Sequence, residues 1–249
     1  MNSPSTPVQA IAAGPLDLRA RDALLQAIRD DQFPGGRLPP EEQLAELLGI
    51  SRGTLRSALQ SLSADGVISR RRRHGTIINR HVLQSTMPLN RLVPFTQLIE
   101  QSGWDATSDP QEVRTAAATP EQAAALGISD GEPVAIARRL LRADGQPVIT
   151  VTDIVAVSRL TVPANEIRGA DTTFDFLTRN ASTEVDYAIT ELIPRVATAA
   201  QPKGLGLTRG TPFIELRETH FDLSQARVAL SVVCVVDRLV RLAILRRGH

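Results

Sequence analysis

The chain has few of the residue types that carry covalent, redox or metal chemistry. It contains one cysteine, Cys234, so a disulfide bond within one chain is excluded and the cytoplasm is the favoured compartment. No apolar stretch is long enough to span a bilayer, and the N-terminus lacks the regions of a secretory signal. The histidines are scattered, and no Cys/His spacing indicates a metal site. They are His74, His81, His220 and His249. We therefore expect no metal and no cofactor.

Lysine is nearly absent, and the basic charge consists almost entirely of arginine. Lys203 is the only lysine, and the formal net charge is +1. Residues 1–80 hold eleven arginines against eight acidic residues, whereas residues 81–249 hold seventeen basic against nineteen acidic residues. The N-terminal third is therefore net positive and the remainder net negative, which predicts that a polyanion binds near the N-terminus.

The length of 249 residues is sufficient for two domains with separate cores. Residues 1–15 are rich in Pro, Ser and Ala and are expected to form a disordered tail. A small helical domain is predicted over 16–80 and a proline-containing linker over 81–93. A second domain, in which strands and short helices alternate, is predicted over 94–249.

Hydrophobic periodicity predicts three short helices in the first domain. The first is expected over 17–31, and the second, over 41–48, ends at Gly49, where a left-handed conformation suits glycine. The third begins after Ser51, a favoured N-cap residue. Its buried stripe consists of Leu55, Ala58, Leu59 and Leu62. The second and third helices, joined by a tight turn, form a predicted helix-turn-helix.

The outward face of the third helix carries side chains suited to DNA. Arg52 and Arg56 lie four residues apart and therefore share that face, with Thr54 and Ser57 beside them. Arginine can bind phosphate or pair with guanine through two hydrogen bonds. Hydroxyl side chains can donate to base edges or to the phosphate backbone.

A hairpin with a strongly basic loop follows. Two short strands are expected over 67–69 and 76–78, joined by a loop with four consecutive arginines. Four adjacent like charges repel one another unless a polyanion lies against them. The residues predicted to contact DNA are Arg52, Thr54, Arg56, Ser57, Arg70, Arg71, Arg72, Arg73, His74 and Gly75.

Each of these features has a simpler explanation when it is taken alone. Two amphipathic helices can be a packing unit and nothing more, and a run of arginines can be a solvated loop. Their coincidence at the distances of a winged helix-turn-helix favours DNA binding.

This segment resembles the N-terminal domain of the GntR family of bacterial transcription regulators. The phrases FPGGRLPPEEQLA, GISRGTLRSALQSLSADG and HGTII match the motif of that family. The resemblance implies that Arg52 and Arg56 contact the major groove with Thr54 nearby. It also implies that His74 and Gly75 approach the minor groove.

Two positions depart from the family motif. Pro40 replaces the usual serine, which removes a helix cap worth about 1 kcal/mol. Glu42 stands where many relatives have an arginine that contacts phosphate. We therefore expect an operator half-site that differs from the common one.

The second domain contains an internal repeat. The segment LGISDGEPVAIAR, over 126–138, recurs as LGLTRGTPFIELR over 205–217, with five identities. Each copy indicates a helix end, a tight turn and a strand that leads into a hairpin. The alternative is a coincidence of common turn residues. A duplication predicts a pseudo-symmetric antiparallel sheet with a cleft between its halves. Strands are expected over 111–118, 134–142, 148–157, 184–193, 213–221, 228–236 and 239–245, and helices over 95–102, 119–126 and 174–178.

The second domain resembles the UTRA effector domain of the HutC-like branch of the same family, which shares its fold with chorismate lyase. The resemblance rests on FTQLIEQSG, TPEQAAALGISDGEPVAIARRLLRADGQPV and LGLTRGTPFIELRETHFD. It implies an α+β chain whose second domain is built on an antiparallel sheet. It also implies a homodimer and a small metabolite effector bound near the sheet.

The effector site is only partly indicated. Relatives that sense sugar phosphates carry two basic residues on the third strand, and only Arg139 remains here. Thr172 and Thr173 could bind an anionic group, or they could only cap the helix that they begin. Tyr187 and Glu191 share one strand face and could line the cleft or edge the core.

The predicted function is therefore that of a DNA-binding transcription regulator. We expect a repressor that binds a palindromic operator in double-stranded DNA as a homodimer and is released by a small-molecule effector. One alternative is a chorismate-lyase-like enzyme or ligand-binding protein with an appended DNA-binding domain, although the sequence indicates no catalytic residues. Another is an architectural DNA-binding protein, which would need no ligand-binding domain.

Overall fold

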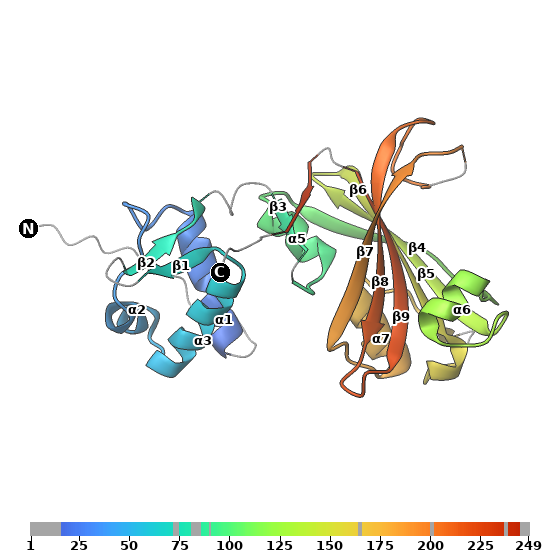
Figure 1. Ribbon diagram of the computed structural model, residues 1–249, viewed down its shortest axis with the longest axis horizontal. Coiled ribbons are helices and arrows are strands. Elements are labelled where there is room, and N and C mark those ends of the chain that lie inside the picture. The colour runs from blue at the N-terminus through green and yellow to red at the C-terminus, as the bar shows by residue number, and fades with distance from the viewer. Residues whose placement is uncertain are drawn as a thin grey trace, which may run out of the picture. The chain divides into compact units, whose positions relative to one another are not determined.

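The structure, a computed structural model, forms two compact units among its described residues (Figure 1). The first unit comprises the described residues up to Arg91 together with Ile244, and the second extends from Leu92 to Ala243. The described residues are 16–71, 75–80, 86–89, 91–163, 166–199, 202–236 and 239–244. The predicted tail over 1–15, part of the predicted linker, and Arg72, Arg73, His74, Asp237 and Arg238 lie outside them.

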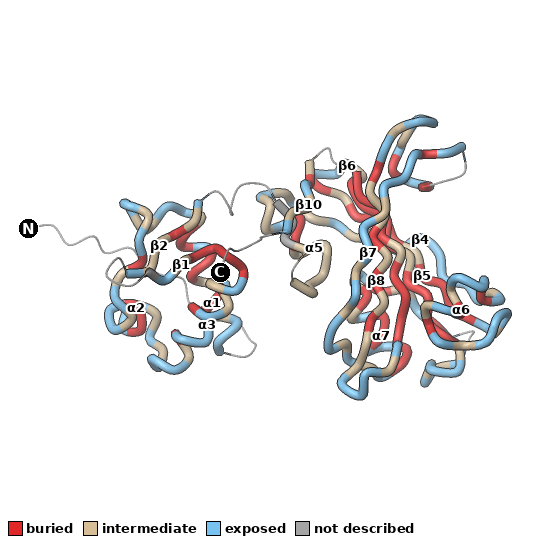
Figure 2. The backbone as a smooth tube through the Cα atoms, in the orientation of Figure 1, coloured by how far each residue is buried: buried red, intermediate tan, exposed pale blue. Residues whose placement is uncertain are grey.

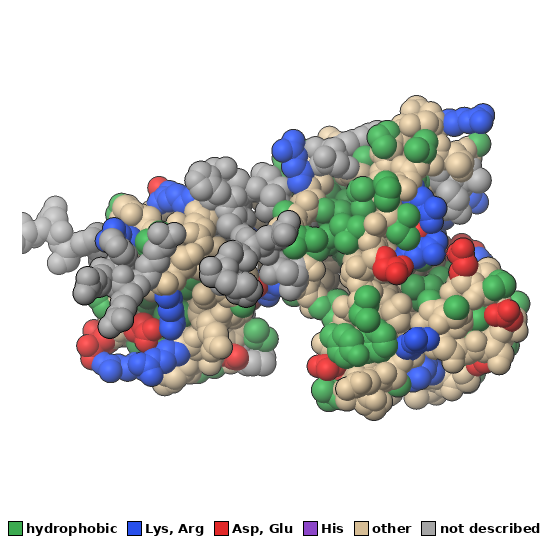
Figure 3. Space-filling view, in the orientation of Figure 1, with side chains coloured by type: hydrophobic (Ala, Val, Ile, Leu, Met, Phe, Trp, Pro, Cys, Tyr) green, Lys and Arg blue, Asp and Glu red, His purple; other side chains and the backbone are tan. Residues whose placement is uncertain are grey.

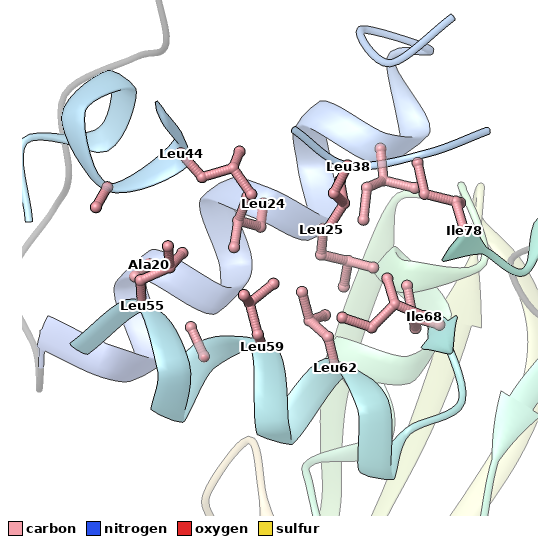
Figure 4. Close-up of a cluster of buried hydrophobic side chains, with 14 residues drawn as sticks. Ala20, Leu24, Leu25, Leu38, Leu44, Leu55, Leu59, Leu62, Ile68 and Ile78 are labelled. Atoms are coloured by element: carbon pink, nitrogen blue, oxygen red, sulfur yellow. The ribbon is translucent and has the colours of Figure 1, made fainter. Parts of the chain in front are cut away.

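The first unit contains the predicted helices and hairpin. Its elements are α1 (Leu16–Arg29), α2 (Glu41–Leu48), α3 (Arg52–Ala64), β1 (Ile68–Arg71) and β2 (Gly75–Ile78). Figure 4 shows Leu24 of α1, Leu44 of α2 and Leu59 of α3 pointing into one core. The leucine stripe of α3 is fully buried, as its spacing predicted. The bounds of α2 are as predicted, and Gly49 ends it with a φ of 62°.

The hairpin strands are longer than the sequence predicted, so the predicted loop over 70–75 was wrong. Arg70 and Arg71 belong to β1, where they pair with Thr76 and Gly75, and only 72–74 remain between the strands. The prediction treated the arginine run as a loop because of its charge. Strand pairing, however, depends on backbone hydrogen bonds, which charged side chains on an exposed hairpin do not prevent.

The second unit is built on a six-stranded antiparallel sheet with the order β4-β5-β6-β9-β8-β7. Its strands are β4 (Ala106–Ala117), β5 (Pro133–Ala143), β6 (Gln146–Ala156), β7 (Tyr187–Val196), β8 (Pro212–Phe221) and β9 (Arg227–Val235). Its helices are α5 (Phe95–Gln101), α6 (Pro120–Leu126), η1 (Val157–Arg159) and α7 (Thr173–Ala181). The second unit also contains the short strand β10 (Arg241–Ala243), whereas the short strand β3 (Thr86–Pro88) belongs to the first unit. The predicted α+β class is confirmed.

Local signals located several of these elements well. Thr119 and Gln122 form a reciprocal capping box at the start of α6, and Gly127 ends the helix with a φ of 68°. The turn between β5 and β6 has positive φ at Asp144 and Gly145, 47° and 77°. Asp-Gly favours this turn because both central residues must adopt positive φ.

Other elements differ from the prediction. The strands expected over 228–236 and 239–245 do not form a hairpin with each other, because β9 lies between β6 and β8 and does not pair with β10. The helix expected before the second repeat copy is absent from the described residues 202–211, which form turns. β4 begins five residues earlier than expected, and β7 begins and ends three residues later. These elements depend on strand pairing between distant segments, which local patterns do not reveal.

A different helix packs on each face of the six-stranded sheet. Ala123 and Leu126 of α6 pack with Ile136 and other even-numbered residues of β5 and β6. Phe176 and Leu177 of α7 pack with odd-numbered residues of the same strands. Because strand residues alternate between faces, α6 and α7 lie on opposite faces. The buried residues in Figure 2 follow the central strands, which are covered on both sides.

Candidate functional sites

The helix α3 presents a polar face directly opposite its buried leucines. Ser51 caps the helix by accepting a hydrogen bond from the Thr54 amide at 3.1 Å. The Thr54 hydroxyl lies 2.9 Å from the Ser51 hydroxyl, so Thr54 also belongs to this cap. Arg52, Arg56 and Ser57 are exposed on the outward face. The structure therefore brings together the α3 residues that the sequence predicted.

The two arginines of α3 form ion pairs with the first turn of α2. Arg52 bonds Glu42, and the Nε of Arg56 lies 3.0 Å from the carboxylate of Glu41. The same carboxylate lies 3.2 Å from Arg70 of β1. Figure 3 shows acidic and basic side chains beside one another over α2 and α3. These pairs join the predicted recognition helix to the predicted wing.

These ion pairs are open to solvent. The Arg52 and Arg56 side chains are 59% and 67% exposed. Pairs between exposed charges contribute at most about 1 kcal/mol, so another anion can replace the carboxylate at small cost. Glu42, the departure from the family motif, is therefore the acid that an anion bound to Arg52 would displace.

A buried ion-pair cluster at the end of α3 was not predicted. The Asp65 carboxylate lies 3.0 Å from Nη2 of Arg21 and 3.1 Å from Nε of Arg91. Burial, followed by the nearby charge of Arg21, lowers the pKa of Arg91 from its ordinary value. An acid beside a helix C-terminus is unfavourable for the helix dipole, and that mismatch is the signal that could have indicated Asp65.

A second polar cluster lies on the α7 face of the sheet. Arg139 donates to the Asp153 carboxylate and to the Thr173 hydroxyl, both at 2.6 Å. Ser231 donates to the same carboxylate at 2.6 Å, and the His220 Nε2 lies 2.9 Å from the Ser231 hydroxyl. All five side chains are buried. Asp153 and Ser231 each interrupt an apolar run in the sequence, which is the signal that sequence reasoning missed.

Burial shifts two pKa values beside this cluster. It lowers the pKa of His220 from 6.5 to about 4, because the charged imidazolium would lose its hydration. Burial also raises the pKa of Glu218 to about 7, although a hydrogen bond from Thr190 at 3.0 Å opposes the shift. The His220 Nδ1 is enclosed and has no partner among the described residues.

The five predicted effector residues do not form one site. Arg139 and Thr173 are in contact, and Thr172 is the N-cap of α7, where its hydroxyl accepts from the Asp175 amide. Tyr187 stacks on Phe221, with ring centroids 4.8 Å apart. Glu191 lies on the edge strand β7, where it pairs with Arg217 of β8. Only the first three therefore surround one end of α7.

The described residues include no cluster of three or more His, Cys, Asp or Glu side chains that could bind a metal ion. No helix in the described part of the chain is long and apolar enough to cross a membrane.

The family matches agree with the two units. Residues 16–78 match the family described as bacterial regulatory proteins, gntR family, and residues 101–235, just over half of the chain, match the UTRA domain. The chain belongs to the GntR family of regulators. This GntR protein carries a UTRA domain, and it is a transcription regulator and not an enzyme.

Its relatives carry similar descriptions. It is 26% identical over 208 residues to the HTH-type transcriptional repressor NagR of Bacillus subtilis, covering 83% of this chain and 84% of NagR. It is 28% identical over 210 residues to the probable transcriptional regulator PhnF of Escherichia coli, covering 84% and 86%. A crystal structure of the possible transcriptional regulator YydK from B. subtilis covers 94% of this GntR protein and 100% of that chain, with a TM-score of 0.71 and 19% identity. At that identity the match shows the fold alone.

Proposed function

We propose that this GntR regulator is a cytoplasmic repressor that binds a palindromic operator as a homodimer and is released by a small metabolite. The observation that carries the proposal is the exposed arginine face of α3, held over a leucine core and joined through Glu41 to the basic hairpin. The proposed DNA contacts are those predicted from the sequence, with Arg52 and Arg56 in the major groove and the hairpin beside the minor groove. The description of NagR as a repressor supports the direction of regulation.

The decisive experiment removes one arginine from α3. The test uses a promoter fragment that the wild type binds in a gel-shift assay. Arg56→Ala should weaken binding to this fragment by about 1–3 kcal/mol. Arg80→Ala is the matched control, because Arg80 is also an exposed, ion-paired arginine of this unit but lies outside α3. Equal affinities of the Arg56→Ala variant and the wild type, measured by fluorescence anisotropy, would refute the assignment of α3 as recognition helix.

For the dimer, we propose that the edge strand β7 pairs with a second copy. β7 lies at one edge of the sheet and exposes Ile189 and Leu192, which are 57% and 47% accessible. Open edge strands with exposed apolar side chains favour pairing with another chain. Leu192→Lys should yield monomers in sedimentation velocity, whereas Leu223→Lys, at an 81% exposed position in the β8–β9 turn, should not. If the Leu192→Lys variant remains a dimer, β7 is not the dimer interface.

For the effector, we propose that the end of α7 binds the metabolite, with Arg139, Thr172 and Thr173 nearest to it; Tyr187 and Glu191, on the edge strand β7, are not part of this proposed site. The helix N-terminus and the guanidinium favour an anionic group. Metabolites of the pathway encoded beside the gene should release DNA from the wild type. Thr172→Val should reduce that release while leaving operator affinity unchanged.

A further inference from the structure

The face of the sheet opposite α7 contains a cavity of about 820 Å³. Its floor includes Arg138, Thr152, Val232 and Cys234, from the three central strands β5, β6 and β9. Of its lining residues, Ile136 and Val232 belong to the apolar cluster under α6, and Phe213 and Cys234 belong to the apolar cluster around Leu205. A cavity of this volume fits a small metabolite.

Strand register shows that the two halves of the sheet contribute equivalent arginines to this face. Arg138 pairs with Thr152 in one half, and Arg217 pairs with Val232 in the other. Thr152 and Val232 pair with each other at the centre of the sheet. Arg138 and Arg217 are also identical positions of the sequence repeat. They therefore correspond under the pseudo-symmetry of the sheet.

The two arginines differ in their charge partners. Arg217 donates through Nε to Glu215 at 2.9 Å, and its Nη2 lies 3.5 Å from Glu121. In the other half, the position that corresponds to Glu215 is Ile136, which is buried in the apolar cluster under α6. The repeat therefore supplies a carboxylate to Arg217 but not to Arg138.

No other described side chain supplies a carboxylate to Arg138. Glu112 pairs with Arg138 across the strands, but its carboxylate bonds Arg114 at 3.0 Å. Arg138 donates through Nη2 to the backbone carbonyl of Lys203, and its Nε is enclosed without an acceptor. Within the described ranges, no carboxylate lies within 4.0 Å of the Arg138 guanidinium. Arg195, the other arginine of the cavity, is paired with Glu215 at 3.1 Å.

We propose that this cavity is a second ligand site, which binds a small monoanionic metabolite with a carboxylate and an apolar body. Arg138 bonds the carboxylate, because a guanidinium matches the two oxygens of a carboxylate and this one lacks an ionic partner. Phe213 and Val232 pack against the apolar body. Arg138 and Arg139 are consecutive in β5 and therefore face opposite sides of the sheet. The site is thus separate from the cluster at α7.

The test uses the full chain and the fluorescent anion 1-anilinonaphthalene-8-sulfonate (ANS). Arg138→Gln should weaken ANS binding about tenfold or more, the usual loss for a charge-assisted hydrogen bond. Arg217→Gln is the matched control and should leave the affinity within about twofold, because Glu215 and Glu121 already neutralise Arg217. Phenylacetate should displace ANS, and the isosteric neutral phenylacetamide should not.

Several results would overturn this proposal. They are no ANS fluorescence with the wild type, equal losses in the two glutamine variants, or equal displacement by phenylacetate and phenylacetamide. If Arg138→Gln does not fold, as judged by circular dichroism, Thr152→Phe tests the same site by filling the cavity while retaining Arg138. It should weaken ANS binding about tenfold, and unchanged binding would reject the site. No DNA is involved, so failure here leaves the proposed operator binding untouched.

Discussion

The two units of this GntR regulator use charged residues in opposite ways. In the first unit, Arg52 and Arg56 pair with acids at the solvent-accessible surface. In the second unit, Arg139 and Asp153 pair in the interior, where hydroxyl groups satisfy the remaining bonds. Exposed pairs exchange partners easily, which suits the DNA-binding role that we propose for this surface. Buried pairs cannot lose a partner without a large penalty, which suits a fixed framework around a ligand.

The largest effect should follow from breaking the buried pair. Asp153→Ala leaves Arg139 charged and without a carboxylate in the interior, so we expect the second unit to lose about 3–5 kcal/mol of stability. Urea unfolding monitored by circular dichroism measures the loss.

An exposed pair in the same sheet is the control. Asp109 bonds Arg142 at 2.8 Å on the surface, and Asp109→Ala should reduce stability by at most about 1 kcal/mol. Similar losses for the two variants would mean that burial does not distinguish these pairs.

A smaller effect should appear in the pH dependence of stability. Below pH 4.5 Glu218 is protonated in the folded and unfolded states alike. As the pH rises from 4.5 towards 7, the unfolded state releases the proton while the folded state retains it, so the folded state loses about 3 kcal/mol. Glu218→Gln should abolish this loss and should therefore be more stable than the wild type by about 2–3 kcal/mol at pH 8, with little difference at pH 4.5.

Comparing the wild type with the Glu218→Gln variant separates the effect of Glu218 from that of His220. His220, whose pKa is lowered, destabilises the fold as the pH falls from 6.5 towards 4, but it does so in both proteins. Guanidinium unfolding at pH 4.5, 6 and 8 tests the prediction. A stability difference that does not change with pH would show that Glu218 is ionised in the folded state.

The smallest effect should come from the exposed pair on α3. Glu42→Gln removes the acid that bonds Arg52, so operator affinity should rise about two- to fivefold. The slope of log affinity against log salt concentration should become steeper by up to about the value for one phosphate contact.

The control changes the same charge at another place on α2. Glu46→Gln removes an exposed acid that bonds neither Arg52 nor Arg56 in the described part of the chain. Fluorescence anisotropy at several salt concentrations compares the two variants. Equal increases would indicate a general charge effect in place of a competition for Arg52.

Prediction from sequence succeeded where the deciding interactions are local. Ser51 caps α3 and Gly49 ends α2, because these residues satisfy or permit a backbone conformation within a few positions. The Asp144–Gly145 turn follows the same rule. Strand ends were less accurate, as the extension of β1 through Arg71 shows, because the partner strand and not the local sequence determines where pairing stops.

The candidate sites divide in the same way. The α3 face was predictable, since helical spacing alone places Arg52 and Arg56 opposite the leucine stripe. The cluster around Asp153 was not predictable, because Arg139, Thr173 and Ser231 come from three separate elements. The contact between Asp65 and Arg21 likewise joins residues 44 positions apart.

The sequence by itself determined the helix-turn-helix, its arginine face and the repeated hairpins, because these features depend on spacing and on single turn residues. Tertiary structure alone decided which strands meet at the centre of the sheet and which charges find partners. Whether Arg138 or Arg217 has a carboxylate depends on one position per half, Ile136 or Glu215, after the strands have paired. Charge neutralisation acts over a few ångströms in space, and only the folded chain defines that distance.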